Sequence, residues 1–326
     1  MHRASVALWI WAFATSAVAE APFLTWPLQC IPGVECYIED YVDADPADGA
    51  QRDYTCGIKS RDGHRGTDFA LTDMRIYARG VPVVAAAPGV VSATRDGVTD
   101  QLYTDDTAHL VDGRECGNAV RIEHENGLQT LYCHLRKDSV RVSKGEEVAR
   151  GAPLGLVGLS GQTNYPHVHM SVLGPDGQID PFDPDAAATG TCGAATSNLW
   201  IDPQVYTPTG MFTAGFSDRV PTFDDVRSGA ARVQRATPDS AMVLYAHVYY
   251  ALDGDQIRFH AIGPTGETFD RTVTLDAPKA SQFRAFGRKA PAAGWPGGTY
   301  QGTAQLIRDG KILAARFTTL SVRASR

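Results

Sequence analysis

Short runs of apolar residues, separated by glycines and polar turns, make up most of this chain. Between Ile58 and Phe182 the runs are rich in β-branched residues, as in VPVVAAAPGVVSAT, NAVRIEH, LQTLYCHL, LGLVG and HVHMSV. A second set follows nearer the C-terminus: AMVLYAHVYY, QIRFHAIG, TYQGTAQLI and KILAARFTTLSV. Runs this short with frequent turn residues are typical of strands in hairpins. The pattern therefore predicts an all-β fold.

Asn-Gly and Asp-Gly dipeptides lie between several of these runs and predict where strands reverse. Asn126-Gly127 separates two alternating runs of the central region, and Asp253-Gly254 and Asp309-Gly310 do the same nearer the C-terminus. Such dipeptides are the strongest short-range signal for a hairpin. Strands at this spacing over roughly 120 residues predict a small C-terminal β-sandwich, for which an immunoglobulin-like topology is one option.

The N-terminus has the pattern of a secretory signal peptide. Arg3 precedes an apolar stretch, Val6 to Phe13, and Ala17-Val18-Ala19 offers a small-residue cleavage site. A membrane anchor is the alternative, but spanning a bilayer takes about 20 apolar residues, and serine and threonine interrupt this stretch. We therefore expect residues 1–19 to be removed near Ala19 and the mature protein to be periplasmic or secreted, without a stable membrane anchor.

Three segments are expected after residue 19. Residues 20–57 are rich in Pro, Asp and Gly and are interpreted as an extended, acidic N-terminal segment pinned by cysteines. Residues 58–190 are expected to form the first β domain, with a polar surface loop between Thr94 and Cys116. A linker rich in Gly, Ala and Thr leads to the C-terminal β domain, residues 198–326.

Charge and cysteine content narrow the class of protein. The chain has 326 residues with Lys+Arg 30 against Asp+Glu 37, a net charge of -7, which argues against a nucleic-acid binder because such proteins need clustered cations. An even number of cysteines, six, in an exported chain predicts disulfides, and six cysteines allow 15 pairings. The short Pro-Gly loop favours Cys30–Cys36 and the central hairpin favours Cys116–Cys133, which leaves Cys56–Cys192.

Three short histidine motifs lie in the central β region. His64 and Asp68 are four residues apart, which in a straight strand is about 13 Å, too far to share a metal unless Gly66 bends the chain. His167 and His169 lie two apart and would point to the same face of a strand. His134 ends an apolar strand. Each motif alone has an ordinary structural explanation, and we interpret His109, His124, His247 and His260 as structural.

Taken together, the order HxxxD, YxHL, HxH resembles that of the lysostaphin/LytM-type zinc metallopeptidases, over roughly residues 58–184. The resemblance implies a LytM-type (duplicated hybrid motif-like) β-sheet catalytic domain. It also implies that His64, Asp68 and His169 bind one zinc ion, and that His134 and His167 are the catalytic pair. The enlarged loop between Thr94 and Cys116 and the three cysteine pairs depart from the family pattern and leave the shape of the groove open.

The resemblance implies a zinc metalloendopeptidase that hydrolyses peptide bonds of bacterial cell-wall peptidoglycan. Two imidazoles and one carboxylate leave an open position on zinc, as in catalytic sites. The alternative is a catalytically silent member of the fold that binds or activates a separate wall hydrolase. The C-terminal domain is expected to orient the catalytic domain, cover its groove, or contact the cell wall or a protein partner.

The acidic segment could also restrain the site. Residues 20–57 would lie across the groove in this hypothesis, with Asp43, Asp45 or Asp48 approaching the metal.

Overall fold

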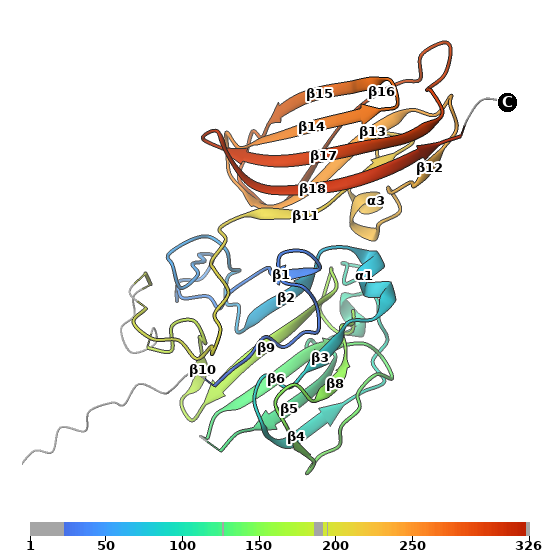
Figure 1. The fold of residues 1–326 in the computed structure, drawn as a ribbon. Coiled ribbons are helices and arrows are strands. Elements are labelled where there is room, and N and C mark those ends of the chain that lie inside the picture. Colours follow the sequence, from blue (N-terminus) through green and yellow to red (C-terminus); the bar gives the residue numbers. More distant parts are fainter. Residues whose placement is uncertain (1–22, 126, 186–191, 194, 324–326) are drawn as a thin grey trace, which may run out of the picture.

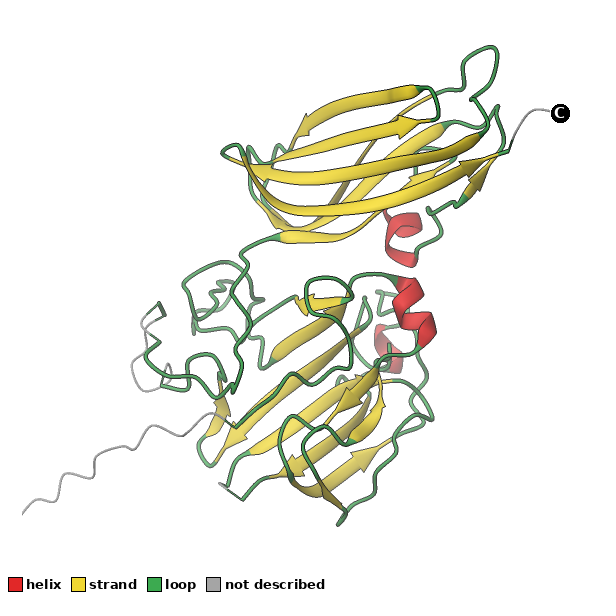
Figure 2. Ribbon diagram, in the orientation of Figure 1, coloured by secondary structure: helices red, strands yellow, loops and turns green. Residues whose placement is uncertain are grey.

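The computed structural model describes residues 23–125, 127–185, 192–193 and 195–323, so the predicted signal peptide lies outside the described residues. The fold is nearly all β, as expected, and its helical elements are few and short (Figure 2). Within the described residues they are α1 (Met74–Arg79), η1 (Ala108–Leu110) and α3 (Phe223–Ser228). Among the described residues, none of the helices has the length and apolar character needed to cross a membrane.

The first unit is built on one large antiparallel sheet. Its strand order is β1-β2-β9-β6-β5-β4-β7, with β10 added at β9, and β3 and β8 pair separately. The bounds are β1 (Cys36–Ile38), β2 (Thr67–Leu71), β3 (Pro82–Val84), β4 (Gly89–Arg95), β5 (Asn118–Glu123), β6 (Gln129–Leu135), β7 (Glu147–Val148), β8 (Pro153–Leu156), β9 (His167–Gly174) and β10 (Gly177–Ile179).

The acidic N-terminal segment is part of this unit. Strand β1 pairs with β2, with Ile38 opposite Phe69. Leu24, Leu28 and Tyr41 are buried in the same hydrophobic core as the central strands. Apolar side chains spaced among the acidic residues therefore pack the segment against the sheet. Its strand β1 lies at the edge of the sheet and holds β2 in place.

The C-terminal unit contains two sheets, in the orders β11-β13-β16 and β12-β18-β17-β14-β15, that share one apolar core (Figure 1). An immunoglobulin-like topology stays a prediction. The bounds are β11 (Gly210–Ser217), β12 (Arg235–Ala236), β13 (Met242–Ala251), β14 (Gln256–Gly263), β15 (Gly266–Thr274), β16 (Lys279–Arg288), β17 (Gly298–Arg308) and β18 (Lys311–Val322).

One of the predicted hairpins does not form, so that prediction is wrong. β5 pairs with β6, and β17 pairs with β18 around Asp309-Gly310, as expected. At Asp253-Gly254, however, the chain passes from β13 in one sheet to β14 in the other. The Asp255 carboxylate accepts a hydrogen bond from the Leu252 amide at 2.8 Å and closes this turn. Strand β13 is buried along its whole length, because it lies between β11 and β16 with the first unit against its other face.

The three predicted disulfides are confirmed. Cys30 is bonded to Cys36 and Cys116 to Cys133. Cys56 is bonded to Cys192 across 136 residues, so it joins the N-terminal segment to the end of the first unit.

Aromatic side chains fill the boundary between the two units. Tyr37 of β1 stacks on Tyr249 of β13 with ring centroids 4.7 Å apart, and Tyr165 contacts Phe212 of β11 at 5.3 Å. These residues form a buried cluster of their own. Polar contacts flank it, including an Arg232–Asp73 ion pair at 3.3 Å beside α1. The sandwich is therefore packed directly on the strands β1 and β2.

The disulfide loop lengths predict unequal effects on stability. Replacing Cys56 and Cys192 by Ser should lower the free energy of unfolding by about 5 kcal/mol, because a long loop is released in the unfolded chain. Replacing Cys30 and Cys36 by Ser should cost about 2 kcal/mol, since that loop is short. Guanidinium unfolding of the two double variants measures the difference. Equal losses would contradict the loop-entropy explanation.

Candidate metal centre

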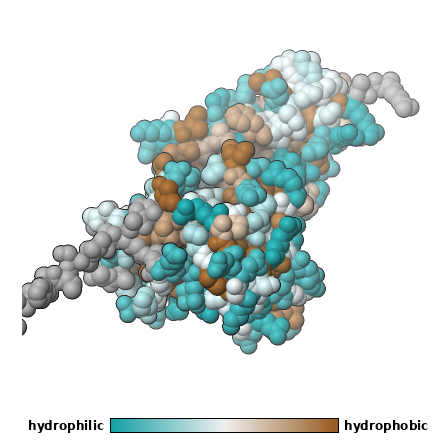
Figure 3. Space-filling view, turned by 60° about the horizontal axis from the view of Figure 1, so that its bottom comes forward, coloured by the Kyte–Doolittle hydropathy of each residue, from teal (hydrophilic) through white to brown (hydrophobic). Residues whose placement is uncertain are grey.

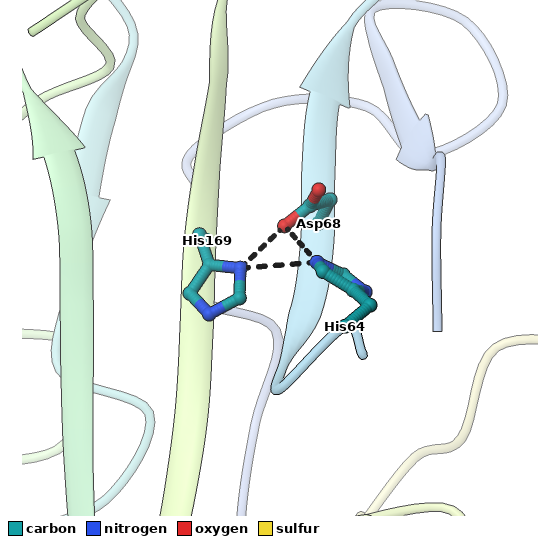
Figure 4. A group of neighbouring side chains, drawn as sticks. All are labelled: His64, Asp68 and His169. Atoms are coloured by element: carbon teal, nitrogen blue, oxygen red, sulfur yellow. Dashed lines mark hydrogen bonds and ion pairs between the residues drawn. The ribbon is translucent and has the colours of Figure 1, made fainter. Parts of the chain in front are cut away.

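Strand pairing brings two of the predicted ligands together. In the antiparallel pair β2–β9, Asp68 lies directly opposite His169. Their side chains meet on the same face of the sheet, with Asp68 Oδ1 2.8 Å from His169 Nδ1 (Figure 4). Asp68 is only 1% exposed and His169 17%. The register of one strand pair therefore creates this contact.

His64 reaches the same point from the loop before β2. Gly66 lies at a bend just ahead of the strand, which brings His64 Nε2 to 3.1 Å from Asp68 Oδ1 and 3.1 Å from His169 Nδ1. Gly66 also needs to be a glycine, because a Cβ there would lie 2.5 Å from His169 Nε2. The bend expected from the sequence is present.

Hydrogen bonds outside the cluster turn its lone pairs inward. His64 Nδ1 donates to the Tyr41 carbonyl at 2.7 Å, which leaves Nε2 without a proton. His169 Nε2 donates to Ser171 Oγ at 3.1 Å, and the Ser171 hydroxyl donates to the Arg65 carbonyl at 2.7 Å, so His169 Nδ1 is also an acceptor. Two imidazole lone pairs and a carboxylate oxygen thus point at one another, an arrangement that only a shared cation or proton stabilises.

The spacing of these atoms fits zinc. Bonds of about 2.0 to 2.2 Å at tetrahedral angles place ligand atoms roughly 3.3 Å apart. The three separations here are 2.8, 3.1 and 3.1 Å. Two imidazoles with one carboxylate are a ligand set found in catalytic zinc sites. The residues His64, Asp68 and His169 therefore fit a zinc ion.

The other two predicted histidines lie beside this cluster. The rings of His134 and His167 are 4.7 Å apart, and His134 is 6.2 Å from His169. His134 Nδ1 donates to the Ser160 carbonyl at 2.8 Å, and His167 Nδ1 to the Tyr165 carbonyl at 2.8 Å. Both Nε2 atoms are therefore acceptors. His167 Nε2 is buried, lacks a hydrogen-bond partner among the described residues and lies 3.6 Å from Asp68 Oδ2.

Burial and charge set the protonation of the cluster. Burial would raise the pKa of Asp68, but His64 and His167 outweigh it, and the pKa lies well below its ordinary value. Burial lowers the pKa of His134 well below its ordinary value, and the charge of His167 adds to this. Burial also lowers the pKa of His167. At neutral pH this favours an ionised Asp68 beside neutral His134 and His167. Burial opposes a charge on His64, but the negative charge of Asp68 outweighs it and raises the pKa of His64.

Asp43, one of the three carboxylates that the latency hypothesis named, is engaged by backbone amides. Asp43 Oδ1 accepts the amides of Asp45 and Arg52, and its Oδ2 accepts the amide of Gly63 at 2.8 Å. Its carboxylate therefore closes the loop that carries His64 and is not free for a metal. From this segment, the Tyr41 carbonyl is the group that binds a candidate ligand.

The expected surface loop supports the site. Between Thr94 and Cys116 the chain turns back onto residues 159–163, where Asp100 accepts the Leu159 amide at 2.6 Å and the Tyr103 amide donates to the Thr163 carbonyl at 2.8 Å. This stretch carries the Ser160 carbonyl that orients His134. The enlarged loop therefore holds in place the segment that orients His134.

Both units line a pocket of about 220 Å³ beside the cluster. His167 and Arg61 border it from the first unit. His247, Arg227 and Ser281 border it from the sandwich. Any ligand that fills this pocket contacts both units.

A second group of possible ligands, His260, Glu267 and Asp270, lies on the sandwich. Asp270 is paired with Arg258, and Glu267 is exposed, so we assign this group no function.

His124 hydrogen bonds to Thr130 and the Pro88 carbonyl, in keeping with a structural role. Figure 3 shows polar and apolar side chains interspersed over one face of the molecule.

Sequence reasoning missed the residues that orient the cluster. Arg61 pairs with Asp68, and Ser171 accepts a hydrogen bond from His169. Ser171 could have been found, because it lies two residues after His169 and so on the same strand face. Arg61 lies three residues before His64 in a loop, where spacing predicts no direction for a side chain.

Known proteins resemble this chain in the same region. Residues 62–181 match the family model described as Peptidase family M23. Peptidoglycan DD-endopeptidase ShyA of Vibrio cholerae is 36% identical over 110 residues, covering 34% of this chain and 20% of that protein. DD-carboxypeptidase/endopeptidase Mpg of Neisseria meningitidis is 34% identical over 109 residues, covering 32% of this chain and 19% of that protein. The chain thus spans about a fifth of the length of these relatives.

Two solved structures are similar over a larger share of this chain, with low TM-scores. The catalytic domain of EnpA, a prophage-encoded M23 protein from Enterococcus faecalis, is 25% identical and covers 48% of this chain and 91% of that chain, with a TM-score of 0.30. A zinc containing peptidase from Vibrio cholerae is 28% identical and covers 44% and 39%, with a TM-score of 0.28.

His247 in the pocket wall predicts a pH dependence of stability. Burial, helped by the charge of Arg227, lowers its pKa to about 3. Between about pH 6.5 and that value the unfolded chain binds a proton that the folded chain does not, so stability falls by up to about 1.4 kcal/mol per pH unit of acidification. His247→Gln should show a shallower loss between pH 6.5 and 5 in denaturant titrations. The exposed His109→Gln is the control, and equal slopes in all three proteins would contradict this assignment.

Proposed function

Because residues 62–181 match the model of Peptidase family M23, we propose that this protein is a zinc-dependent endopeptidase that hydrolyses peptide bonds of bacterial cell-wall peptidoglycan. The convergence of His64 Nε2, Asp68 Oδ1 and His169 Nδ1 within 3.1 Å is the observation that carries this proposal. Relatives named as peptidoglycan DD-endopeptidases support the substrate class. They match only 34% and 43% of this chain, so the bond cleaved is left to experiment.

In this proposal His64, Asp68 and His169 would hold zinc, with His134 and His167 lying beside them. A bound zinc ion supplies Lewis-acid polarisation of the scissile carbonyl and lowers the pKa of water to about 7. The protein's part is to keep Asp68 ionised and both imidazole lone pairs directed at one point. The hydrogen bonds to the Tyr41 carbonyl and to Ser171 do this.

His134 and His167 handle protons in this proposal. Each is neutral and anchored at Nδ1 to a backbone carbonyl, so each presents an acceptor at Nε2. A neutral imidazole in this position accepts a proton from the attacking water, and the imidazolium then donates to the oxyanion or to the leaving amine. Their depressed pKa values keep them in the accepting form at neutral pH.

The setting we propose is the periplasm or the outside of the cell, where the three disulfides are stable and peptidoglycan is accessible. The substrate is a peptide of the cell wall. The acidic net charge of -7 gives no support for a nucleic-acid partner. A cell-wall or protein partner at the C-terminal domain is a further part of this proposal.

A catalytically silent activator of another wall hydrolase is the second candidate. A protein of this kind needs neither a zinc ligand set nor accepting imidazoles. All five residues are present here, and His64 Nε2, Asp68 Oδ1 and His169 Nδ1 converge on one point, which favours the enzyme.

Two histidine variants separate the metal-binding role from the catalytic role. His169→Ala should lose both zinc and peptide release, because it removes a ligand. His134→Ala should keep stoichiometric zinc and lose turnover by about 100-fold or more, since it removes only the proton acceptor. Zinc analysis and peptidoglycan digestion measure the two properties, with His109→Ala as a control. Equal zinc loss in both site variants would contradict the assignment of His169 as a ligand and His134 as a proton acceptor.

Digestion of purified peptidoglycan by the mature protein should release peptide fragments whose masses identify the bond. Chelation should abolish this release, and added zinc should restore it. Stoichiometric zinc without any release, even when a second wall hydrolase is supplied, would remove support for the enzyme. Stimulation of that second hydrolase alone would favour the activator.

A further inference from the structure

The two carboxylate oxygens of Asp68 have different partners. Oδ1 faces His64 Nε2 at 3.1 Å and His169 Nδ1 at 2.8 Å. Oδ2 accepts a hydrogen bond from the Arg61 guanidinium. Carboxylates bind divalent cations through one oxygen or through both. With Oδ2 engaged by Arg61, only Oδ1 is available to a cation between the histidines.

A second carboxylate holds Arg61 in place. Arg61 Nε lies 2.5 Å from Asp40 Oδ2, and Asp40 is 4% exposed. The guanidinium is a planar fork, so contacts to two carboxylates through different nitrogens fix its orientation as well as its position. This matters because the Arg61 side chain is itself 54% exposed and would otherwise be free to move.

The C-terminal sandwich supplies the last contact. Tyr250, at the end of β13, donates a hydrogen bond to Asp40 Oδ1, and its hydroxyl oxygen lies 2.8 Å from the Ser60 carbonyl oxygen. Tyr250 has a φ of 45°, in the left-handed region that bulky residues rarely adopt. Backbone strain of this kind persists where surrounding contacts over-determine the conformation, and it clusters at functional sites. A buried tyrosine of the sandwich is thus linked to Asp68 through Asp40 and Arg61.

We propose that Arg61, fixed by Asp40 and Tyr250, is a positioning residue that keeps Asp68 a one-oxygen ligand and so leaves a coordination position free for water or substrate. The inference rests on the proposed zinc site. Removal of Arg61 frees Oδ2, and two-oxygen binding by Asp68 then fills the position that the reaction needs. Zinc is retained, but turnover falls. In this proposal the sandwich contributes to the metal site through Tyr250.

The test compares full-length mature variants by zinc content, kcat and the visible spectrum of the cobalt(II)-substituted protein. Arg61→Gln should keep one zinc per chain, lower kcat by about 10- to 100-fold, and weaken the cobalt bands as the coordination number rises from four to five. Arg61→Lys retains the charge without the fork and should lie between Arg61→Gln and the wild type. Tyr250→Phe should lower kcat several-fold, with a spectral change in the same direction.

Tyr37→Phe is the matched control. It removes a hydroxyl from the same interface, and that hydroxyl has no hydrogen-bond partner among the described residues. Its kcat and spectrum should stay at the wild-type level. An Arg61→Gln variant with wild-type kcat and spectrum, or one that loses zinc, overturns the inference, as does an equal effect of Tyr37→Phe and Tyr250→Phe. Failure of the proposed function is distinct, because the wild type itself would then lack zinc or peptide release.

Discussion

The register of the β2–β9 pair is the constraint on which the candidate site depends. It places Asp68 opposite His169, and the side chains beside them, Phe69 and Val168, are fully buried on the other face of the sheet. Because side chains alternate between faces, a shift of one residue would expose these apolar groups and separate the two ligands. The hydrophobic core that stabilises the sheet therefore also sets the ligand geometry.

Backbone carbonyls orient the histidine rings of the candidate site. The candidate histidines His64, His134 and His167 each bind a carbonyl through Nδ1, so loop conformation determines which nitrogen is free. The loops are restrained in turn. The Cys116–Cys133 bond lies directly before His134, and the His134 amide donates to the Cys116 carbonyl at 2.8 Å. A disulfide next to β9, where Cys133 lies opposite His169, and loops outside the strand pair thus help to determine which histidine nitrogens are free.

Residues of both units line the pocket beside His167. Aromatic stacking places the sandwich on β1 and β2, and the sandwich contributes residues to the pocket beside His167. The family match ends at residue 181, before the sandwich begins. The family match therefore covers the cluster of His64, Asp68 and His169 but not the residues that the sandwich contributes to the pocket.

Local spacing in the sequence was enough to predict the β fold and two of the disulfides, and elimination left the third. The set His64, Asp68, His134, His167 and His169 was predicted from three short motifs whose order resembles that of a known family. Each of these depends on strand periodicity, turn residues or a short motif, which are properties of neighbouring residues. The Asp253-Gly254 error has the same origin, because a turn dipeptide marks where the chain reverses and not which sheet the next strand joins. The roles of Asp40, Arg61 and Tyr250 were beyond such reasoning. Their contacts join residues up to 210 positions apart, and they exist only because packing of the sandwich on β1 and β2 brings those side chains together.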